Sequence, residues 1–371
     1  MNAFWARSIS GGSSASCTGT TSACSSCPFR KSSSVAARIA TNSANDGLRG
    51  PPPGPDPAVV DVGLFLVDFV DINADEQTFE FTATLSMQWE DPRLAFDPDE
   101  AGTSEKVYQG AYQFAEIFPG WWPQLFLRNE SGRFESQGVV LRVSREGVVS
   151  YTEQLQAIAE VKMDLRRLPF DRQRFVVTFE LLGFDVDEVR LRPEPGRTGY
   201  GETTLSQWRI DGVEAVPTTD EPLYVNGEET RISAISFYFP ATRSPKFLLR
   251  LIVFPIMILV ALTWSVFWMD RESLGSRMDI SFIGILTVVA FQIVVSDRMP
   301  RISYFTIMSS FMYVSYLTLA ASVIVNLRVS ALDRRGDKEK GNRLDRRCRW
   351  LFPTAYVGAL FLSAMYYLIR Y

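Results

Sequence analysis

The chain has 371 residues, a formal net charge of −4 and no histidine. This length allows two domains of ordinary size, and a slight acidic excess without a basic patch excludes a nucleic-acid-binding protein. Histidine is the commonest general base and metal ligand, and the sequence also has no phosphate-binding loop or nucleophile elbow, so we expect neither an enzyme nor a bound cofactor.

Residues 1–50 are rich in Ser, Ala, Thr and Gly and show no hydrophobic periodicity. This composition predicts a disordered or poorly ordered N-terminal extension, followed by the proline-rich segment 51–55. The extension contains Cys17, Cys24 and Cys27, which lack a fourth ligand for zinc, so metal binding is left open. It has no apolar core of a signal peptide, although an exported domain needs one.

Apolar and polar residues alternate along residues 79–89 and again along residues 175–181. This period of two predicts half-buried β-strands, each with one apolar face. Turn sequences such as Asn226-Gly227 separate further strand candidates, and no long helical repeat lies between them. We therefore predict that residues 51–243 form an all-β, antiparallel sandwich.

Residues 244–371 contain four long runs without a charged residue. Three of them reach the roughly 18–20 residues that are needed to cross about 30 Å of hydrocarbon, and the second run is slightly shorter. The runs predict a transmembrane bundle of four helices at about residues 247–269, 276–297, 302–327 and 348–370.

The connection between the third and fourth runs is basic. Residues 328–347 contain eight Lys or Arg residues and four acidic residues. Because Lys and Arg concentrate on the cytoplasmic side of membrane spans, we place this connection in the cytoplasm. With four spans, both termini and the strand domain then lie on the extracellular or periplasmic side.

The second run carries a stripe of residues at helical spacing. Steps of 4, 3, 4, 3 and 4 residues place six side chains on one face of a helix, with a carboxylate at each end. Such a face suits the wall of a pore, whereas the alternative is a helix buried among its neighbours whose two Asp side chains reach the interfaces. The candidate pore-lining residues are Asp279, Ile283, Leu286, Ala290, Ile293 and Asp297.

Four local motifs follow one another along the chain. They are Trp89-Glu90-Asp91-Pro92-Arg93-Leu94, Trp121-Trp122-Pro123-Gln124 with Asn129 after it, Pro169-Phe170-Asp171-Arg172-Gln173, and Arg243-Ser244-Pro245-Lys246-Phe247. In this order and spacing they resemble the pentameric ligand-gated ion channels of the Cys-loop receptor superfamily, over about residues 57–371. The two cysteines that bracket the third motif in animal members are absent, since Val161 and Phe175 stand there. With the short cytoplasmic connection, this resembles the prokaryotic branch and implies the plasma membrane of a prokaryote.

The resemblance implies a homopentamer around a central pore lined by the second transmembrane helix. Leu286 would form a hydrophobic girdle that closes by dewetting. Rings of Asp279 and Asp297 would attract permeant monovalent cations, which favours a cation-selective channel. Arg277 or Arg298 could offset these rings, so an anion-selective channel of the same family is one alternative. A non-channel membrane receptor or binding protein is the other.

The resemblance also implies a site for a small-molecule or ionic agonist between neighbouring outer domains. Carboxylate and aromatic groups together suit an amine, whereas a proton, a divalent cation or an anion is the alternative. A cationic Arg128 in this region would repel an amine, and Phe184 has core packing as its other possible role. The candidate agonist-binding residues are Arg128, Glu180, Phe184, Asp220 and Tyr224.

The same resemblance indicates where the outer domain meets the membrane domain. The contact would involve the first predicted hairpin, the loop with the third motif, the start of the first span and the loop between the second and third spans. Opposite charges that meet at low dielectric would link the two domains. The coupling candidates are Asp75, Glu76, Pro169, Phe170, Asp171, Arg243, Arg298, Pro300 and Arg301.

Overall fold

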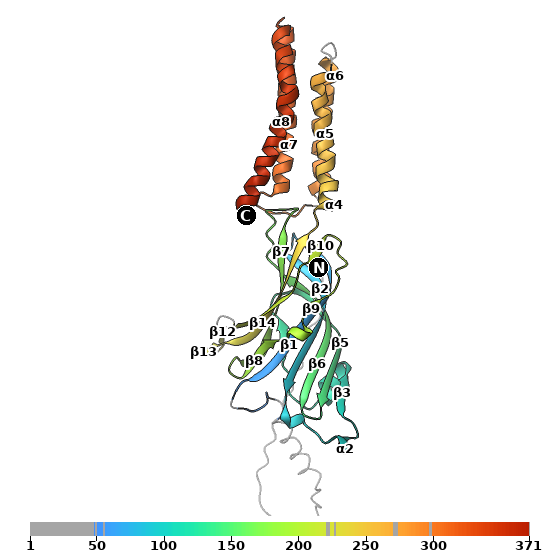
Figure 1. The fold of residues 1–371 in the computed structure, drawn as a ribbon, viewed down its shortest axis with the longest axis vertical. Helices are drawn as coiled ribbons and strands as arrows, with labels where there is room; N and C mark the ends of the chain where they lie inside the picture. The colour runs from blue at the N-terminus through green and yellow to red at the C-terminus, as the bar shows by residue number, and fades with distance from the viewer. Residues whose placement is uncertain are drawn as a thin grey trace, which may run out of the picture. The chain divides into compact units, whose positions relative to one another are not determined.

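The structure is a computed structural model that describes residues 48, 50–54, 56–219, 223–225, 228–269, 274–296 and 299–370. The chain from Leu48 onward forms one compact unit. Its strands precede its long helices in the sequence, and Figure 1 shows the two kinds of element in separate regions. Nearly all of the predicted N-terminal extension lies outside the described residues.

The strand region is a sandwich of two sheets, as the alternating sequence predicts, but it is not wholly antiparallel, since the short strands β8 and β9 pair with β1 in parallel. The larger sheet has the order β3-β5-β6-β2-β1-β8 with β9 also paired to β1, and the smaller sheet has the order β10-β14-β7-β4 with β11 paired to β14. A separate hairpin joins β12 to β13. The strands are β1 Ala58–Asn73, β2 Thr78–Glu90, β3 Glu105–Gln109, β4 Leu125–Leu127, β5 Glu130–Ser144, β6 Val148–Glu160, β7 Arg172–Asp185, β8 Val189–Pro193, β9 Gly199–Tyr200, β10 Trp208–Ile210, β11 Glu214–Thr219, β12 Leu223–Val225, β13 Glu228–Thr230 and β14 Ile232–Arg243.

Aromatic side chains from both sheets meet in the core of the sandwich. The ring of Phe175 on β7 lies 4.9 Å from that of Phe69 on β1, 5.1 Å from Phe79 on β2 and 5.4 Å from Trp208 on β10. Each buried Phe contributes about 1.5–3 kcal/mol through the hydrophobic effect, and tilted ring pairs at these distances add to it. The period of two places these rings on the inner faces of the two sheets.

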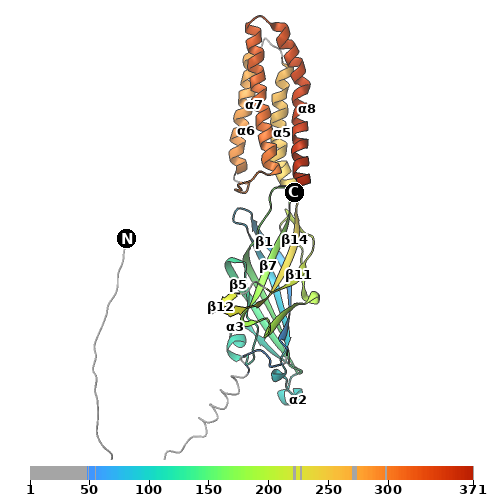
Figure 2. The ribbon, with the colours of Figure 1, turned by 90° about the vertical axis from the view of Figure 1, so that its left-hand side faces the viewer.

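The helical region consists of four antiparallel helices that run side by side (Figure 2). The first is continuous over Lys246–Trp268 and includes a π-helical stretch at Leu249–Val253, next to Pro255. It and the last two helices are long and apolar enough to cross a membrane, and Met278–Ile293 forms a shorter apolar segment. The helices are α2 Pro98–Ala101, α3 Gly110–Tyr112, α4 Lys246–Leu248, α5 Phe254–Ser265, α6 Leu274–Ser296, α7 Ile307–Arg334 and α8 Lys338–Arg370.

The last two helices differ in extent from the uncharged runs of the sequence. We expected helices at about 302–327 and 348–370, but α7 spans Ile307–Arg334 and α8 spans Lys338–Arg370. The basic connection is therefore mostly helical, and only residues 335–337 turn between the two helices. Charge excludes a residue from the hydrocarbon but not from a helix, because Lys, Arg and Glu are good helix formers in water.

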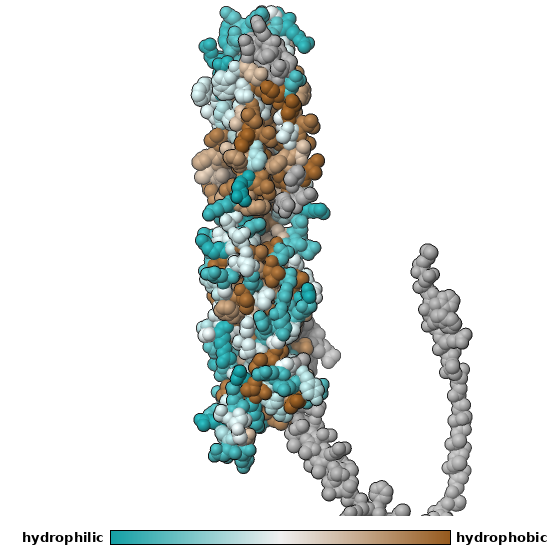
Figure 3. Space-filling view, turned by 90° about the vertical axis from the view of Figure 1, so that its right-hand side faces the viewer, coloured by the Kyte–Doolittle hydropathy of each residue, from teal (hydrophilic) through white to brown (hydrophobic). Residues whose placement is uncertain are grey.

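Large apolar side chains cover the outside of the helices, as Figure 3 shows. Leu317 on α7 and Leu362 on α8 are each 70% exposed, and Ile369 is 76% exposed. A contiguous apolar surface of this kind on a soluble protein would promote aggregation. In a bilayer it faces lipid, which agrees with the predicted transmembrane bundle.

Small and polar residues hold α6 against its neighbours. Asn326 on α7 donates a 2.9 Å hydrogen bond from Nδ2 to Oγ of Ser281 on α6, and both residues are buried. A Cβ atom added at Gly284 would lie 2.8 Å from Oγ1 of Thr263 on α5. Close approach at small residues, with hydrogen bonds between helices, is the usual basis of packing inside a bilayer.

We predict that Gly284→Val destabilises the helical region, because the added side chain pushes into Thr263. Overpacking of this kind costs about 1–3 kcal/mol. Gly358→Val in α8 is the matched control, since nothing lies within 4 Å of a Cβ added there. Thermal denaturation of the detergent-solubilised protein should show a lower midpoint for Gly284→Val alone. Equal midpoints in the two variants would contradict the close approach of α5 and α6.

Candidate pore, domain junction and ligand site

One face of α6 is buried within the chain and the opposite face is not covered. Ser281, Val288 and Val295 are seven residues apart and between 0% and 2% exposed. Residues two positions apart lie about 200° apart around a helix, so the side opposite this buried stripe carries Leu286 and Ile293, which are 70% and 68% exposed.

The predicted pore-lining residues lie on this uncovered side. Asp279, Ile283, Leu286, Ala290 and Ile293 are all exposed, whereas Asp297 lies outside the described residues. The exposed surface of α6 is wider than the predicted stripe, since Phe282 and Val289 are 54% and 50% exposed as well. The carboxylate of Asp279 lies on this uncovered side, and a carboxylate is costly to expose to lipid. We therefore expect other protein or water, and not lipid, next to this side of α6.

A buried ion pair lies where the last strand of the sandwich leads into the first transmembrane helix. Nε of Arg243 on β14 lies 2.9 Å from Oδ1 of Asp171, which precedes β7, and the two side chains are 10% and 2% exposed. Gln173 donates a 2.7 Å hydrogen bond to the other carboxylate oxygen. The guanidinium also stacks 4.2 Å from the ring centre of Trp208. The charges are thus paired, hydrogen-bonded and shielded from water, which a buried ion pair requires.

The β1–β2 hairpin reaches the segment that joins α6 to α7. Oδ1 of Asp75 accepts a 2.5 Å hydrogen bond from the backbone N–H of Arg301. Asp75 and Pro300 also line a cavity of about 480 Å³ together with Arg243. Glu76 lies in the same turn, where Asn73 caps its backbone N–H, and Arg298 lies outside the described residues.

The loop of the Pro-Phe-Asp motif touches the start of α7. The backbone N–H of Leu165 donates a 3.1 Å hydrogen bond to the hydroxyl of Tyr304, and the N–H of Ile307 donates to the carbonyl of Arg166 at 3.1 Å. Pro169 is buried in this loop, whereas Phe170 is 50% exposed. The structure therefore brings the predicted hairpin, loop and pre-helix residues to one junction.

Sequence reasoning missed two polar residues of this junction. Gln77 adopts a left-handed backbone with φ of 57°, and its Oε1 accepts a 2.7 Å hydrogen bond from the N–H of Met163. It therefore ties the hairpin to the Pro-Phe-Asp loop. Tyr304 contacts a residue 139 positions earlier in the chain. Neither contact has a local pattern in the sequence that could have revealed it.

Of the five candidate agonist residues, two contact each other. Arg128 and Glu180 form an ion pair with Nε and Oε1 2.9 Å apart, and Glu180 is buried whereas the Arg128 side chain is half exposed. Phe184 is partly buried, and its ring lies 5.8 Å from that of Trp121 at the edge of the core. Tyr224 lies on β12, and Asp220 lies outside the described residues.

A groove lies beside the ion pair on the outer face of the smaller sheet. Its volume is about 880 Å³. Its floor includes a 2.9 Å hydrogen bond between the hydroxyls of Thr178 and Ser236, and Arg174 stacks on Tyr238 at its edge, 3.9 Å from the ring centre. The groove also reaches Arg128, so the ion pair borders a space large enough for a small ligand.

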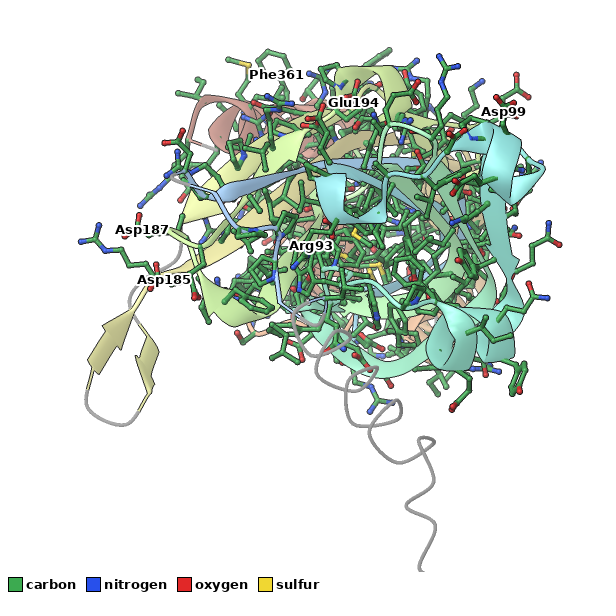
Figure 4. The ribbon with its side chains drawn as sticks, turned by 90° about the horizontal axis from the view of Figure 1, so that it is seen from below. Arg93, Asp99, Asp185, Asp187, Glu194 and Phe361 are labelled. Atoms are coloured by element: carbon green, nitrogen blue, oxygen red, sulfur yellow. The ribbon has the colours of Figure 1, made fainter. Side chains whose placement is uncertain are left out.

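The β12–β13 hairpin emerges next to the end of β7. Figure 4 shows Asp185 and Asp187 beside the base of this hairpin. Oδ2 of Asp185 accepts a 3.1 Å hydrogen bond from the N–H of Arg231, which follows β13. This bond fixes the base of the hairpin to the strand that carries Glu180 and Phe184.

The described residues contain no group of three or more Cys, Asp or Glu side chains that could hold a metal ion. Cys17, Cys24 and Cys27 lie outside that part of the chain. Cys348 on α8 is buried as a free thiol.

We predict that Arg243→Gln lowers the yield and thermal stability of the protein, because it leaves Asp171 buried without a cation. Breaking a buried pair in this way costs about 3–5 kcal/mol. Arg209→Gln is the matched control, since Arg209 pairs with Asp211 at 3.1 Å on the neighbouring strand but is 77% exposed. That change should cost less than about 1 kcal/mol. Equal thermal midpoints for the two variants would show that the buried pair does not stabilise the junction.

Comparison with known proteins agrees with this architecture. Residues 45–245 match the neurotransmitter-gated ion-channel ligand-binding domain, and residues 252–342 match the neurotransmitter-gated ion-channel transmembrane region. A proton-gated ion channel from Gloeobacter violaceus is 25% identical over 321 residues, which cover 86% of each chain.

Animal receptor subunits are similar over a smaller share of their length. A gamma-aminobutyric acid receptor subunit beta-like protein of Drosophila melanogaster is 25% identical over 290 residues, which are 73% of this chain and 56% of the relative. The human gamma-aminobutyric acid receptor subunit rho-1 is 26% identical over 295 residues, which are 76% of this chain and 59% of the relative. This chain thus spans little more than half the length of these two relatives. Taken with the sandwich, the four helices and the junction between them, the matches identify the chain as a member of the pentameric Cys-loop family of ligand-gated ion channels, integral membrane proteins with an extracellular ligand-binding domain.

Proposed function

We propose that the protein is a homopentameric, cation-selective channel of a prokaryotic plasma membrane, with an extracellular domain at 51–243 and a transmembrane domain at 244–371. The observation that carries this proposal is the uncovered side of α6. The predicted pore-lining residues that the structure describes, all but Asp297, are exposed on the side opposite the buried stripe, and a symmetric ring of such helices would enclose an axis. In that ring the five copies of Leu286 form the narrow apolar girdle, which closes by dewetting.

Charge at the ends of the stripe supports cation selectivity. Asp279 is exposed on the same side of α6 as Leu286, and in the proposed topology it lies on the cytoplasmic side of the girdle. Five carboxylates at one level of a narrow pore concentrate cations and repel anions. Asp297 supplies the matching ring at the outer mouth of the proposed pore.

The ligand site is proposed in the outer domain, around Arg128, Glu180, Phe184, Asp220 and Tyr224. The groove beside the Arg128–Glu180 pair and the fixed base of the β12–β13 hairpin support this position. Relatives are named for different agonists, protons in one case and gamma-aminobutyric acid in others. The agonist of this chain is therefore argued from its own residues.

The signal from the ligand site would pass through the junction contacts. Asp75 and Glu76 on the hairpin, Pro169–Asp171 on the loop and Arg243 before the first helix form the outer side of this proposed route. Arg298, Pro300 and Arg301 form its membrane side. The hydrogen bond from Arg301 to Asp75 supports it, because movement of the hairpin then acts directly on the segment that follows the pore helix.

Two carboxylates are poor candidates for a proton sensor. The hydroxyl of Thr242 donates a hydrogen bond to Asp211 and holds the pKa of that carboxyl below its ordinary value. Burial raises the pKa of Asp68, but hydrogen bonds from Thr204 outweigh this effect, so the net pKa is also lowered. Because both pKa values are lowered, the two groups stay ionised to a lower pH than an ordinary Asp does.

We predict that Leu286→Ser produces a current without an agonist, because a polar girdle wets the pore. In a sodium chloride gradient across the membrane, this current should reverse near the sodium potential. Adding Asp279→Asn should move the reversal toward the chloride potential by removing the inner ring of charge. Asp337→Asn is the control, since Asp337 lies in the turn between α7 and α8 and not on α6.

Three results would contradict parts of the proposal. A Leu286→Ser current that reverses near the chloride potential would leave a channel but make it anion-selective. An equal shift of the reversal potential by Asp279→Asn and Asp337→Asn would show that Asp279 does not line the pore. Surface-expressed Leu286→Ser without any current would favour a non-channel receptor.

A further inference from the structure

The buried carboxylate of Glu180 is the starting point. Glu180 lies on β7 between Ala234 of β14 and Phe126 of β4, so strands flank it on both sides. It is 3% exposed. A buried carboxylate at such a position is costly unless a cation pairs with it.

Arg128 supplies that cation from within the same chain. It follows β4, and its Nε lies 2.9 Å from Oε1 of Glu180. Among the described residues no N–H meets hydrogen-bond geometry at this oxygen, so the contact with Arg128 is an ion pair. The rest of the guanidinium extends toward the groove, where the side chain is half exposed.

A ligand amine would have to compete with this tethered guanidinium. Covalent attachment gives Arg128 a high effective concentration at Glu180, and its delocalised charge loses less on dehydration than an ammonium does. An amine that enters the groove therefore meets an exposed positive charge in front of a carboxylate that is already neutralised.

We propose that Arg128 determines agonist specificity by occupying the cation subsite of Glu180, so that the protein rejects small cationic amines. This inference rests on the proposed position of the ligand site. The native ligand then presents a neutral or anionic group to Arg128. Removal of the Arg128 side chain leaves a cation-shaped space in front of Glu180, and small guanidines or amines bind there.

The test is chemical rescue of Arg128→Ala by ethylguanidine and n-propylamine, each added to purified full-length protein in detergent. The thermal midpoint of Arg128→Ala should lie several degrees below that of the wild type and should rise with added ethylguanidine until it saturates. The wild type should show no such shift. Arg128→Ala/Glu180→Gln should lose the rescue, because the neutral amide no longer attracts the cation.

Arg174→Ala is the matched control. Arg174 lines the same groove and pairs with Glu214 at 2.8 Å, but both of these side chains are more than half exposed. Its removal should give no saturable response to ethylguanidine. If Arg128→Ala does not fold alone, the same comparison is made on the yield of protein purified with and without ethylguanidine, and with Arg128→Gln as a milder variant.

Three results would overturn the inference: a folded Arg128→Ala protein with no ligand-dependent shift, equal rescue of the double variant, or a saturable shift of the wild type that Glu180→Gln abolishes. Currents separate this inference from the proposed function. If ethylguanidine stabilises Arg128→Ala through Glu180 but evokes no current, then Arg128 fills a cation subsite at Glu180, but its role in agonist specificity is overturned because the agonist site lies elsewhere.

Discussion

The buried Asp171–Arg243 ion pair is the interaction on which the arrangement of the protein most depends. It joins the loop before β7 to the end of β14, directly before the first transmembrane helix begins. Polar groups that meet at this level have little water around them, so each charge must find its partner within the protein. Gln173 and Trp208 complete the site, one through a hydrogen bond to the carboxylate and the other through its aromatic face.

The other contacts at the junction involve the segment between α6 and α7 and the first residue of α7. Asp75 binds the backbone of Arg301, and the Pro-Phe-Asp loop binds Tyr304 and Ile307. The strand domain therefore contacts the segment between α6 and α7 as well as the chain directly before the first helix.

Within the membrane, the same requirement for satisfied polar groups decides which face of α6 is covered. Ser281 is next to Asn326 and Gly284 is next to Thr263. The small and hydrogen-bonding residues of α6 are therefore buried in packing contacts within the chain. The apolar stripe through Leu286 is left outside, with Asp279 at its end. In the outer domain Arg128 plays a comparable part for Glu180, since a carboxylate buried beside a groove is stable only with a cation in contact.

The sequence by itself determined the sandwich, the four-helix bundle and the face of α6 that carries the pore candidates, because each depends on a local period of 2 or 3.6 residues or on run length. It underestimated α7 and α8, since charge marks the edge of the hydrocarbon rather than the end of a helix. The tertiary structure alone decided the pairing of Arg128 with Glu180 and the parts played by Gln77 and Tyr304. These contacts join residues up to 139 positions apart, and no local pattern specifies which distant polar group will satisfy a buried one.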